Sequence, residues 1–212
     1  MSPRSPWRVR SRVVLAVVGV VALLGVAGIV AGYSLLAPGF DPNGACTSDG
    51  RAPGAYPALE ALVPATFDGT KPQTLDSGRK CTKDGLATLA SHGIAEARFA
   101  GAFWPTAAES GTSLAVFQAP GLTAQWLSEY YEAGARASSN VTTLRPSTTT
   151  VQGQPAYRLD VENGGNLQSV VTWPDPATSV IRVAIVSEAA RDGATLAKLD
   201  SSIQQAIAAF AP

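Results

Sequence analysis

The chain is poor in the side chains that enzymes use most often. Its 212 residues include one histidine, His92, and two cysteines, Cys46 and Cys81, all well separated in sequence. Zinc sites need closely spaced cysteine and histidine ligands, so this pattern excludes the common zinc motifs. Glycine-rich phosphate loops, EF-hand loops and the nucleophile elbow are also absent from the sequence. We therefore predict no catalytic residue, no metal site and no cofactor.

Charged residues are also scarce, at 15% of the chain, and they are unevenly placed. Four of the sixteen basic residues, Arg4, Arg8, Arg10 and Arg12, precede the first long apolar run. The remainder has twelve basic and sixteen acidic residues, so its net charge is about −4. Nucleic-acid binding depends on clustered lysine and arginine. A mildly acidic remainder therefore argues against nucleic acid as a partner.

One apolar run extends from Val13 to Ala37 without a charged residue. As a helix it would be about 37 Å long, which exceeds the ~30 Å hydrocarbon core of a bilayer. The arginines before it place a basic tail, residues 1–12, in the cytoplasm by the positive-inside bias. We expect a signal anchor at residues 13–37, in the cell membrane, with the C-terminal domain outside. The alternative is a secreted protein, released by signal-peptide cleavage after Ala27.

The spacing of two glycines in this apolar run suggests that a second copy of the chain is a partner. Gly28 and Gly32 are four positions apart, the spacing that lets two membrane helices approach closely, so a weak homodimer is one hypothesis. The other predicted partners are the membrane itself and an unknown envelope protein or ligand. The alanine-rich, methionine-poor composition favours a bacterial source.

After the apolar run the composition changes to proline, glycine and short polar residues. Residues 38–57 are typical of a flexible linker, and residues 58–212 are predicted to form one folded domain. Apolar spacing and capping residues predict helices at 58–63, 83–92, 123–137 and 194–210. Alternation and turn residues predict strands at 95–104, 112–118, 157–162, 167–173 and 179–187. Residues 142–151 form an edge strand or a loop, because Pro146 cannot donate to a ladder.

This order of elements predicts an α+β fold: a mainly antiparallel sheet of about five or six strands packed against two or three helices, preceded by one transmembrane helix. The helix, meander and helix order, together with the segment Val151 to Tyr157, loosely resembles the PsbP-like sandwiches. That resemblance covers about sixty residues near the C-terminus and implies an architecture only, not a function.

His92 is the first candidate for catalysis, since it follows Ser91 at the end of a short predicted helix. Adjacent positions on a helix point apart, so His92 is badly placed to activate Ser91. A basic side chain near a helix C-terminus also interacts favourably with the helix dipole. We therefore interpret His92 as a structural residue.

Two carboxylate pairs are the remaining candidates, Asp160 with Glu162 and Glu96 with Glu109. Strand alternation places Asp160 and Glu162 on a solvated face, which accounts for them without catalysis. Glu96 shares a strand face with Arg98, and we expect these two side chains to form an exposed ion pair.

Three function classes follow. The preferred one is a single-pass, membrane-anchored extracytoplasmic domain that acts as a non-enzymatic binding or interaction module of the cell envelope. The second is a small-ligand or lipid-binding module with a pocket lined by Trp126, Tyr130 or Trp173. The third is an envelope hydrolase, which requires His92 or a carboxylate pair to lie in a cleft.

Cys46 and Cys81 are the only cysteines, and both are predicted to lie outside the cytoplasm. Oxidising compartments pair such thiols, so we predict a structural disulfide between them. The alternative, two free cysteines buried as small apolar groups, is disfavoured because Cys46 lies among glycine, serine and aspartate.

The mature protein is expected to retain Val13 to Ala37, because the chain stays apolar beyond Ala27 and leaves no accessible polar cleavage site. Mass analysis of the N-terminus of the native protein checks this. A mature chain that begins at Gly28 would contradict retention.

Overall fold

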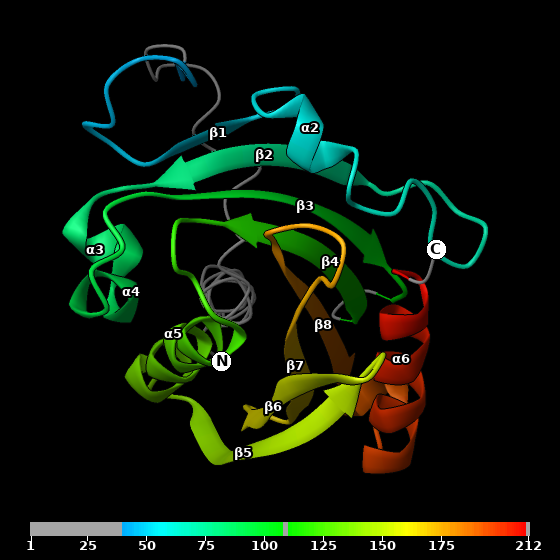
Figure 1. Cartoon of the computed structure of the whole chain (residues 1–212). Helices are drawn as coiled ribbons and strands as arrows, with labels where there is room; N and C mark the ends of the chain where they lie inside the picture. Colours follow the sequence, from blue (N-terminus) through cyan, green and yellow to red (C-terminus); the bar gives the residue numbers. More distant parts are fainter. Residues whose placement is uncertain (1–39, 108–109, 211–212) are drawn as a thin grey trace, which may run out of the picture.

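The computed structural model describes residues 40–107 and 110–210, which form one antiparallel sheet with helices on both of its faces (Figure 1). The eight strands lie in the order β1-β2-β3-β4-β8-β7-β6-β5, and all neighbours are antiparallel. The strands are β1 (Gly50–Ala52), β2 (Thr74–Lys80), β3 (Ala97–Pro105), β4 (Gly111–Gln118), β5 (Val141–Val151), β6 (Gln154–Asn163), β7 (Asn166–Pro174) and β8 (Ile181–Ala189).

The helices lie on opposite sides of this curved sheet, with α5 on one side and α6 on the other (Figure 1). Those described are α2 (Pro57–Glu60), α3 (Lys83–Leu86), α4 (Thr88–Ser91), α5 (Ala124–Ala137) and α6 (Leu196–Ala208), with a 3₁₀ turn at Ala190–Asp192.

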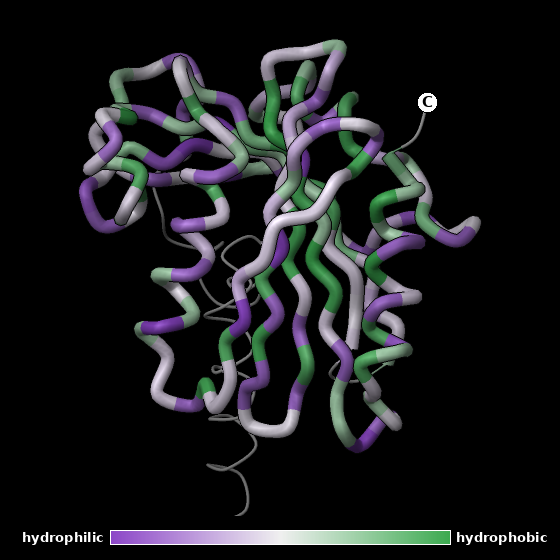
Figure 2. Tube along the Cα trace, turned by 60° about the horizontal axis from the view of Figure 1, so that its bottom comes forward, coloured by the Kyte–Doolittle hydropathy of each residue, from purple (hydrophilic) through white to green (hydrophobic). Residues whose placement is uncertain are grey.

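Side-chain alternation along the central strand β8 creates two cores. Val183 and Ile185 belong to the core that contains α3, α4 and α5, whereas Ala184 and Val186 belong to the core with α2 and α6. We call these two sides of the sheet the α5 face and the α6 face. Figure 2 shows hydrophobic and hydrophilic residues alternating along the strands. The strand predicted at 179–187 is present as β8, which lies in the middle of the sheet and contributes to both cores.

Helix α5 forms where the sequence predicts it. The Thr123 hydroxyl accepts a hydrogen bond from the Trp126 N–H at 3.2 Å and caps the helix. Leu127, Tyr131 and Ala135, spaced four residues apart, are buried against the sheet. The burial of Tyr131 raises the pKa of its phenol well above the ordinary value. This stripe is therefore core.

The predicted fold class is wrong. An α+β fold with five or six strands was expected after a transmembrane helix, but the sheet has eight strands and few of the described residues are helical. The missed strands are β1 and β2, whose glycines and polar residues leave no hydrophobic alternation. The predicted helix over residues 83–92 is also broken, because Ala87 has a φ of 44° and separates α3 from α4.

Within residues 40–107 and 110–210, no helix has both the length and the apolarity to cross a bilayer. The predicted signal anchor at Val13 to Ala37, its basic tail and the Gly28 and Gly32 pair lie outside the described residues. Those statements therefore stay predictions.

Part of the predicted linker, residues 38–57, belongs to the sheet. Gly50–Ala52 forms β1, which pairs with residues 77–79 of β2. Cys46 and Cys81 form a disulfide with their Cα atoms 6.0 Å apart, so that prediction is confirmed. The bond ties the segment before β1 to the end of β2.

A buried arginine holds the same segment. Arg79 is 5% exposed, and its guanidinium donates to the carbonyls of Asp41, Gly44 and Ala45 at 3.2, 2.7 and 3.0 Å. The guanidinium carbon also lies 5.4 Å from the centre of the Phe40 ring. These contacts compensate the cost of burying the charge. The chain is therefore anchored to the domain from Phe40 onward.

Removing the disulfide with the double substitution Cys46→Ser and Cys81→Ser is expected to destabilise the domain by about 4 kcal/mol, because the bond closes a 35-residue separation. At this size the melting temperature should fall by about 10 °C. Calorimetry on the full chain in detergent measures the change, and reduced wild type is the control. A fall of less than about 3 °C would contradict the assignment of the bond as a major stabiliser.

Candidate functional site

Strand β5 forms one edge of the sheet and is the longest strand described. It has eleven residues, and within the described chain it pairs with β6 alone. Its residues 145–150 are all exposed. The sequence predicted either an edge strand or a loop for residues 142–151, and the structure shows an edge strand.

The register shows which backbone groups of β5 point outward. Pro146 has no N–H, so it cannot form a hydrogen-bonded pair with Leu159, its partner in register. Because the two kinds of pair alternate along an antiparallel ladder, Arg145 and Ser147 make the bonds to β6. The outward groups are then the carbonyls of Leu144, Pro146, Thr148 and Thr150 and the N–H groups of Leu144, Thr148 and Thr150.

A groove of about 430 Å³ lies between β5 and α5 on the α5 face. Its walls come from α5, β5 and β6, and they carry carboxylate, amide and hydroxyl groups but no lysine or arginine. The residues that line it are Gln125, Ser128, Glu129, Glu132, Pro146, Ser147, Thr148 and Tyr157.

A chain of polar contacts holds the wall of this groove in place. The Tyr157 hydroxyl donates to Gln125 Oε1 at 3.4 Å, and Gln125 Nε2 donates to Glu129 Oε1 at 3.0 Å. The other Glu129 oxygen lies 2.8 Å from His92 Nε2. The His92 ring stacks on Trp126 with centroids 4.5 Å apart and planes 8° apart. These contacts join α4, α5 and β6.

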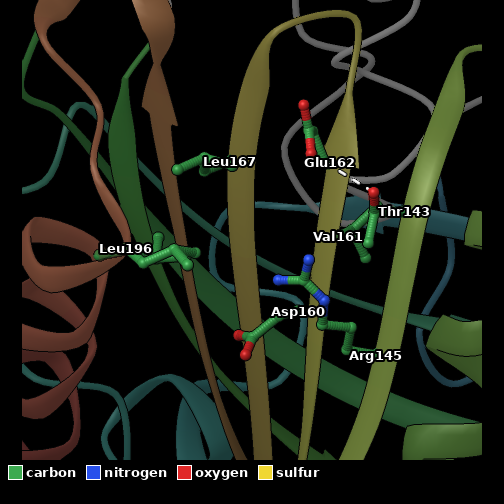
Figure 3. Close-up of a pocket in the computed structure, with 8 residues that line it drawn as sticks. Thr143, Arg145, Asp160, Val161, Glu162, Leu167 and Leu196 are labelled. Carbon is green, nitrogen blue, oxygen red and sulfur yellow. Dashed lines mark hydrogen bonds between the residues drawn. The ribbon is translucent and has the colours of Figure 1, made fainter.

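A smaller cavity of about 140 Å³ flanks β5 on the α6 face (Figure 3). Arg145 extends from β5 into this cavity, while Asp160 and Glu162 enter it from β6. Asp160 is held by Arg158 at 2.8 Å. Arg145 has no hydrogen-bond or ion-pair partner within the described part of the chain. Leu196, 51% exposed, lies at the rim of the cavity.

The structure separates the residues that the sequence offered for catalysis. His92 ends α4 and binds Glu129, whereas the Ser91 hydroxyl donates to the Thr88 carbonyl at 2.6 Å. The histidine and the serine are therefore not coupled. The nearest polar partner of His92 is a carboxylate, and among the described contacts it has no nucleophile.

Of the two predicted carboxylate pairs, Asp160 and Glu162 stay together, because both line the cavity on the α6 face. Asp160 and Glu162 share the α6 face of β6, where Arg158 binds Asp160 and the Thr143 hydroxyl donates to Glu162 at 3.4 Å. The expected exposed pair between Glu96 and Arg98 is present at 2.7 Å. Glu109 lies outside the described residues. No group of three or more histidine, cysteine, aspartate or glutamate residues in 40–107 and 110–210 is arranged to hold a metal ion.

The aromatic residues proposed to line a ligand pocket lie elsewhere. Trp173 is fully buried in the α6-face core, with Phe210 5.5 Å away between ring centroids. Trp126 and Tyr130 are partly buried and pack against the α5-face core. None of the three lines either cavity beside β5.

Comparison with known proteins adds no assignment. No family model, curated protein or solved structure matches this chain, so the resemblance to PsbP-like sandwiches finds no support there. The geometry of the site therefore carries the functional argument alone.

Sequence reasoning missed Glu129 and Glu132, which line the groove on the α5 face, and Arg145, which enters the cavity on the α6 face. They are ordinary surface charges in the sequence, and only the pairing of β5 with β6 brings the strand beside α5. The one usable signal was Pro146, which indicated an edge strand.

The contact between His92 and Glu129 is expected to stabilise the groove wall. A double-mutant cycle with His92→Ala and Glu129→Gln should give a coupling free energy of about 0.5 to 1 kcal/mol, because solvent partly screens a half-exposed pair. Chemical denaturation of the four proteins measures it. A coupling within about 0.2 kcal/mol of zero would show that the two side chains act independently.

Proposed function

We propose that this protein is a non-enzymatic binding module of the cell envelope, and that β5 with its groove against α5 is the surface that captures a partner protein. The observation that carries the proposal is an eleven-residue edge strand whose outward side is unpaired within the described chain. Exposed edges are templates for strand addition, and several peptide-binding domains use an edge strand beside a helix in this way.

The contrast between the two edges supports this choice. The opposite edge, β1, has three residues and is flanked by the disulfide and by the segment that Arg79 holds. Natural proteins blunt edges by keeping them short or covered. On β5, Pro146 removes one outward donor, Arg145 adds a charge and the register shifts between Val141 and Thr143, but the strand is neither short nor covered by another described segment.

We further propose that Val13 to Ala37 anchors the protein in the cell membrane, with the folded domain outside; secretion after signal-peptide cleavage is the alternative. The disulfide supports an oxidising compartment. Phe40 lies beside Arg79 at the β1 and β2 side of the sheet. Seven strand spacings, about 34 Å measured along the curved sheet, lie between that side and β5, so we propose that the open edge is the one farther from the membrane attachment.

The other two function classes have less support. Ligand sites usually enclose about 300 to 1,000 Å³, more than the 140 Å³ beside Arg145, and the groove beside α5, although about 430 Å³ in volume, is open to solvent and does not enclose a ligand. A hydrolase needs an activated nucleophile, and the contacts of His92 supply none among the described residues.

Photo-crosslinking in the native host tests the proposal. A photoreactive residue at position 128, in the groove wall, should give a covalent adduct with a protein partner in intact cells. The same residue at position 204, on the exposed side of α6, should give none. Adducts equal in yield at both positions, or absent at 128, would contradict the proposed surface.

A proline substitution links the adduct to the strand edge. Thr148→Pro removes an outward N–H without touching the ladder to β6, so it should reduce the adduct at least tenfold. Thr66→Pro, at an exposed loop position, is the matched control and should leave the yield unchanged. Circular dichroism checks that both variants fold. An adduct that survives Thr148→Pro would refute strand addition.

A further inference from the structure

Resting on this proposed function, we infer the chemistry of the partner: an extended protein segment that places basic residues in the groove beside α5 and an acidic residue beside Arg145. A strand that bonds to the outward groups of β5 alternates its side chains between the two sheet faces. Residues on one side would meet Pro146 and Thr148, and residues on the other would meet Arg145 and Ser147. The α5 side and the α6 side of β5 differ in charge.

The α5 side is acidic. Glu129 and Glu132 line the groove, and no lysine or arginine does. Glu132 is bound to Arg136 of the next turn, but that arginine side chain is 62% exposed, so solvent screens the pair. A lysine or arginine entering the groove meets one carboxylate held by His92 and a second one that can exchange its partner. Basic side chains therefore fit this side.

The α6 side presents a positive group. Arg145 lies opposite Asp160 in register, yet Asp160 is bound to Arg158, which also contacts Asp200. The guanidinium of Arg145 therefore has no partner within the described residues. An acidic side chain on the added strand, directly opposite Arg145, gains a cross-strand pair of opposite charge. Lysine at that position would meet a like charge.

These charges argue against a second copy of this chain as the occupant. The α5-side residues of β5 that would enter a neighbour's groove are Leu144, Pro146, Thr148 and Thr150, and all are uncharged. A pair of copies joined through β5 would bring no further cation to the carboxylates of either groove, whose partners would stay His92 and Arg136. A heterologous basic segment would add one.

A designed peptide tests the inference on the full chain in detergent. The probe is a fluorescent octapeptide, Thr-Lys-Thr-Lys-Glu-Lys-Thr-Lys, whose lysines fall on one strand face and whose glutamate falls on the other. Fluorescence anisotropy should show at least tenfold tighter binding than for a peptide of the same composition with its four lysines consecutive. Glu132→Lys should weaken binding of the patterned peptide at least tenfold. Asp84→Lys, an equal charge change on α3, should not.

The outcomes separate the inference from the proposed function. If both peptides bind equally, or Asp84→Lys weakens binding as much as Glu132→Lys, attraction is non-specific and the inference is overturned. Failure of the patterned peptide to bind also overturns it, while an adduct at position 128 that depends on Thr148 would leave the proposed function standing. Light scattering is the last check: a dimer abolished by Thr148→Pro would assign the edge to a second copy and contradict the inference.

Discussion

The unpaired backbone N–H and C=O groups of the two edge strands are the constraint on which this structure depends. Every open sheet has two edges, and each must be covered, shortened or used. At the β1 edge, Arg79 binds the carbonyls of the preceding segment and the disulfide secures the same segment to β2. At the β5 edge the chain provides no comparable cover among its described residues. The asymmetry between the two edges is the basis of the functional argument.

The remaining surface offers few alternatives because both sheet faces serve stability. Leu127 from α5 and Ile203 from α6 are fully buried, and the side chains of β8 fill both cores. Some of the buried polar side chains bond to one another across neighbouring strands. Gln168 Nε2 on β7, for example, donates to the Ser187 hydroxyl on β8 at 2.9 Å. Because helices cover much of both sheet faces, the sheet edges are the surface that stays available to a binding partner. The two cavities beside β5 lie there.

The sequence predicted most of the elements whose cause is local. Helix α5 follows from its apolar stripe and Thr123 cap, and the turn between β6 and β7 follows from Gly164 and Gly165, whose φ values are 59° and 88°. It failed at β1 and β2, where Ser77 and Arg79 are buried to bind Tyr56 N–H and backbone carbonyls. Such polar residues interrupt hydrophobic alternation, so tertiary contacts defined these strands.

The site was less predictable than the fold because its parts come from distant segments. His92 and Glu129 are 37 residues apart, and Tyr157 is 32 residues beyond Gln125. No periodicity within one element brings them together. Pro146 was the one local sign of the strand edge. The pairing in the disulfide was simple to predict, since a chain with two cysteines can pair them internally in one way.

Hydrogen exchange resolved to single amides of β5 tests the central claim most directly, on the full chain in lysate of its native host and after purification. In the purified protein, the amides of Thr148 and Thr150 should exchange much faster than those of Arg145 and Ser147, which bond to β6. In the host lysate the outward amides should become protected, because the proposed partner strand would bond to them. Equal exchange of Thr148 and Ser147 in the purified protein, or outward amides that stay unprotected in the lysate, would contradict the account.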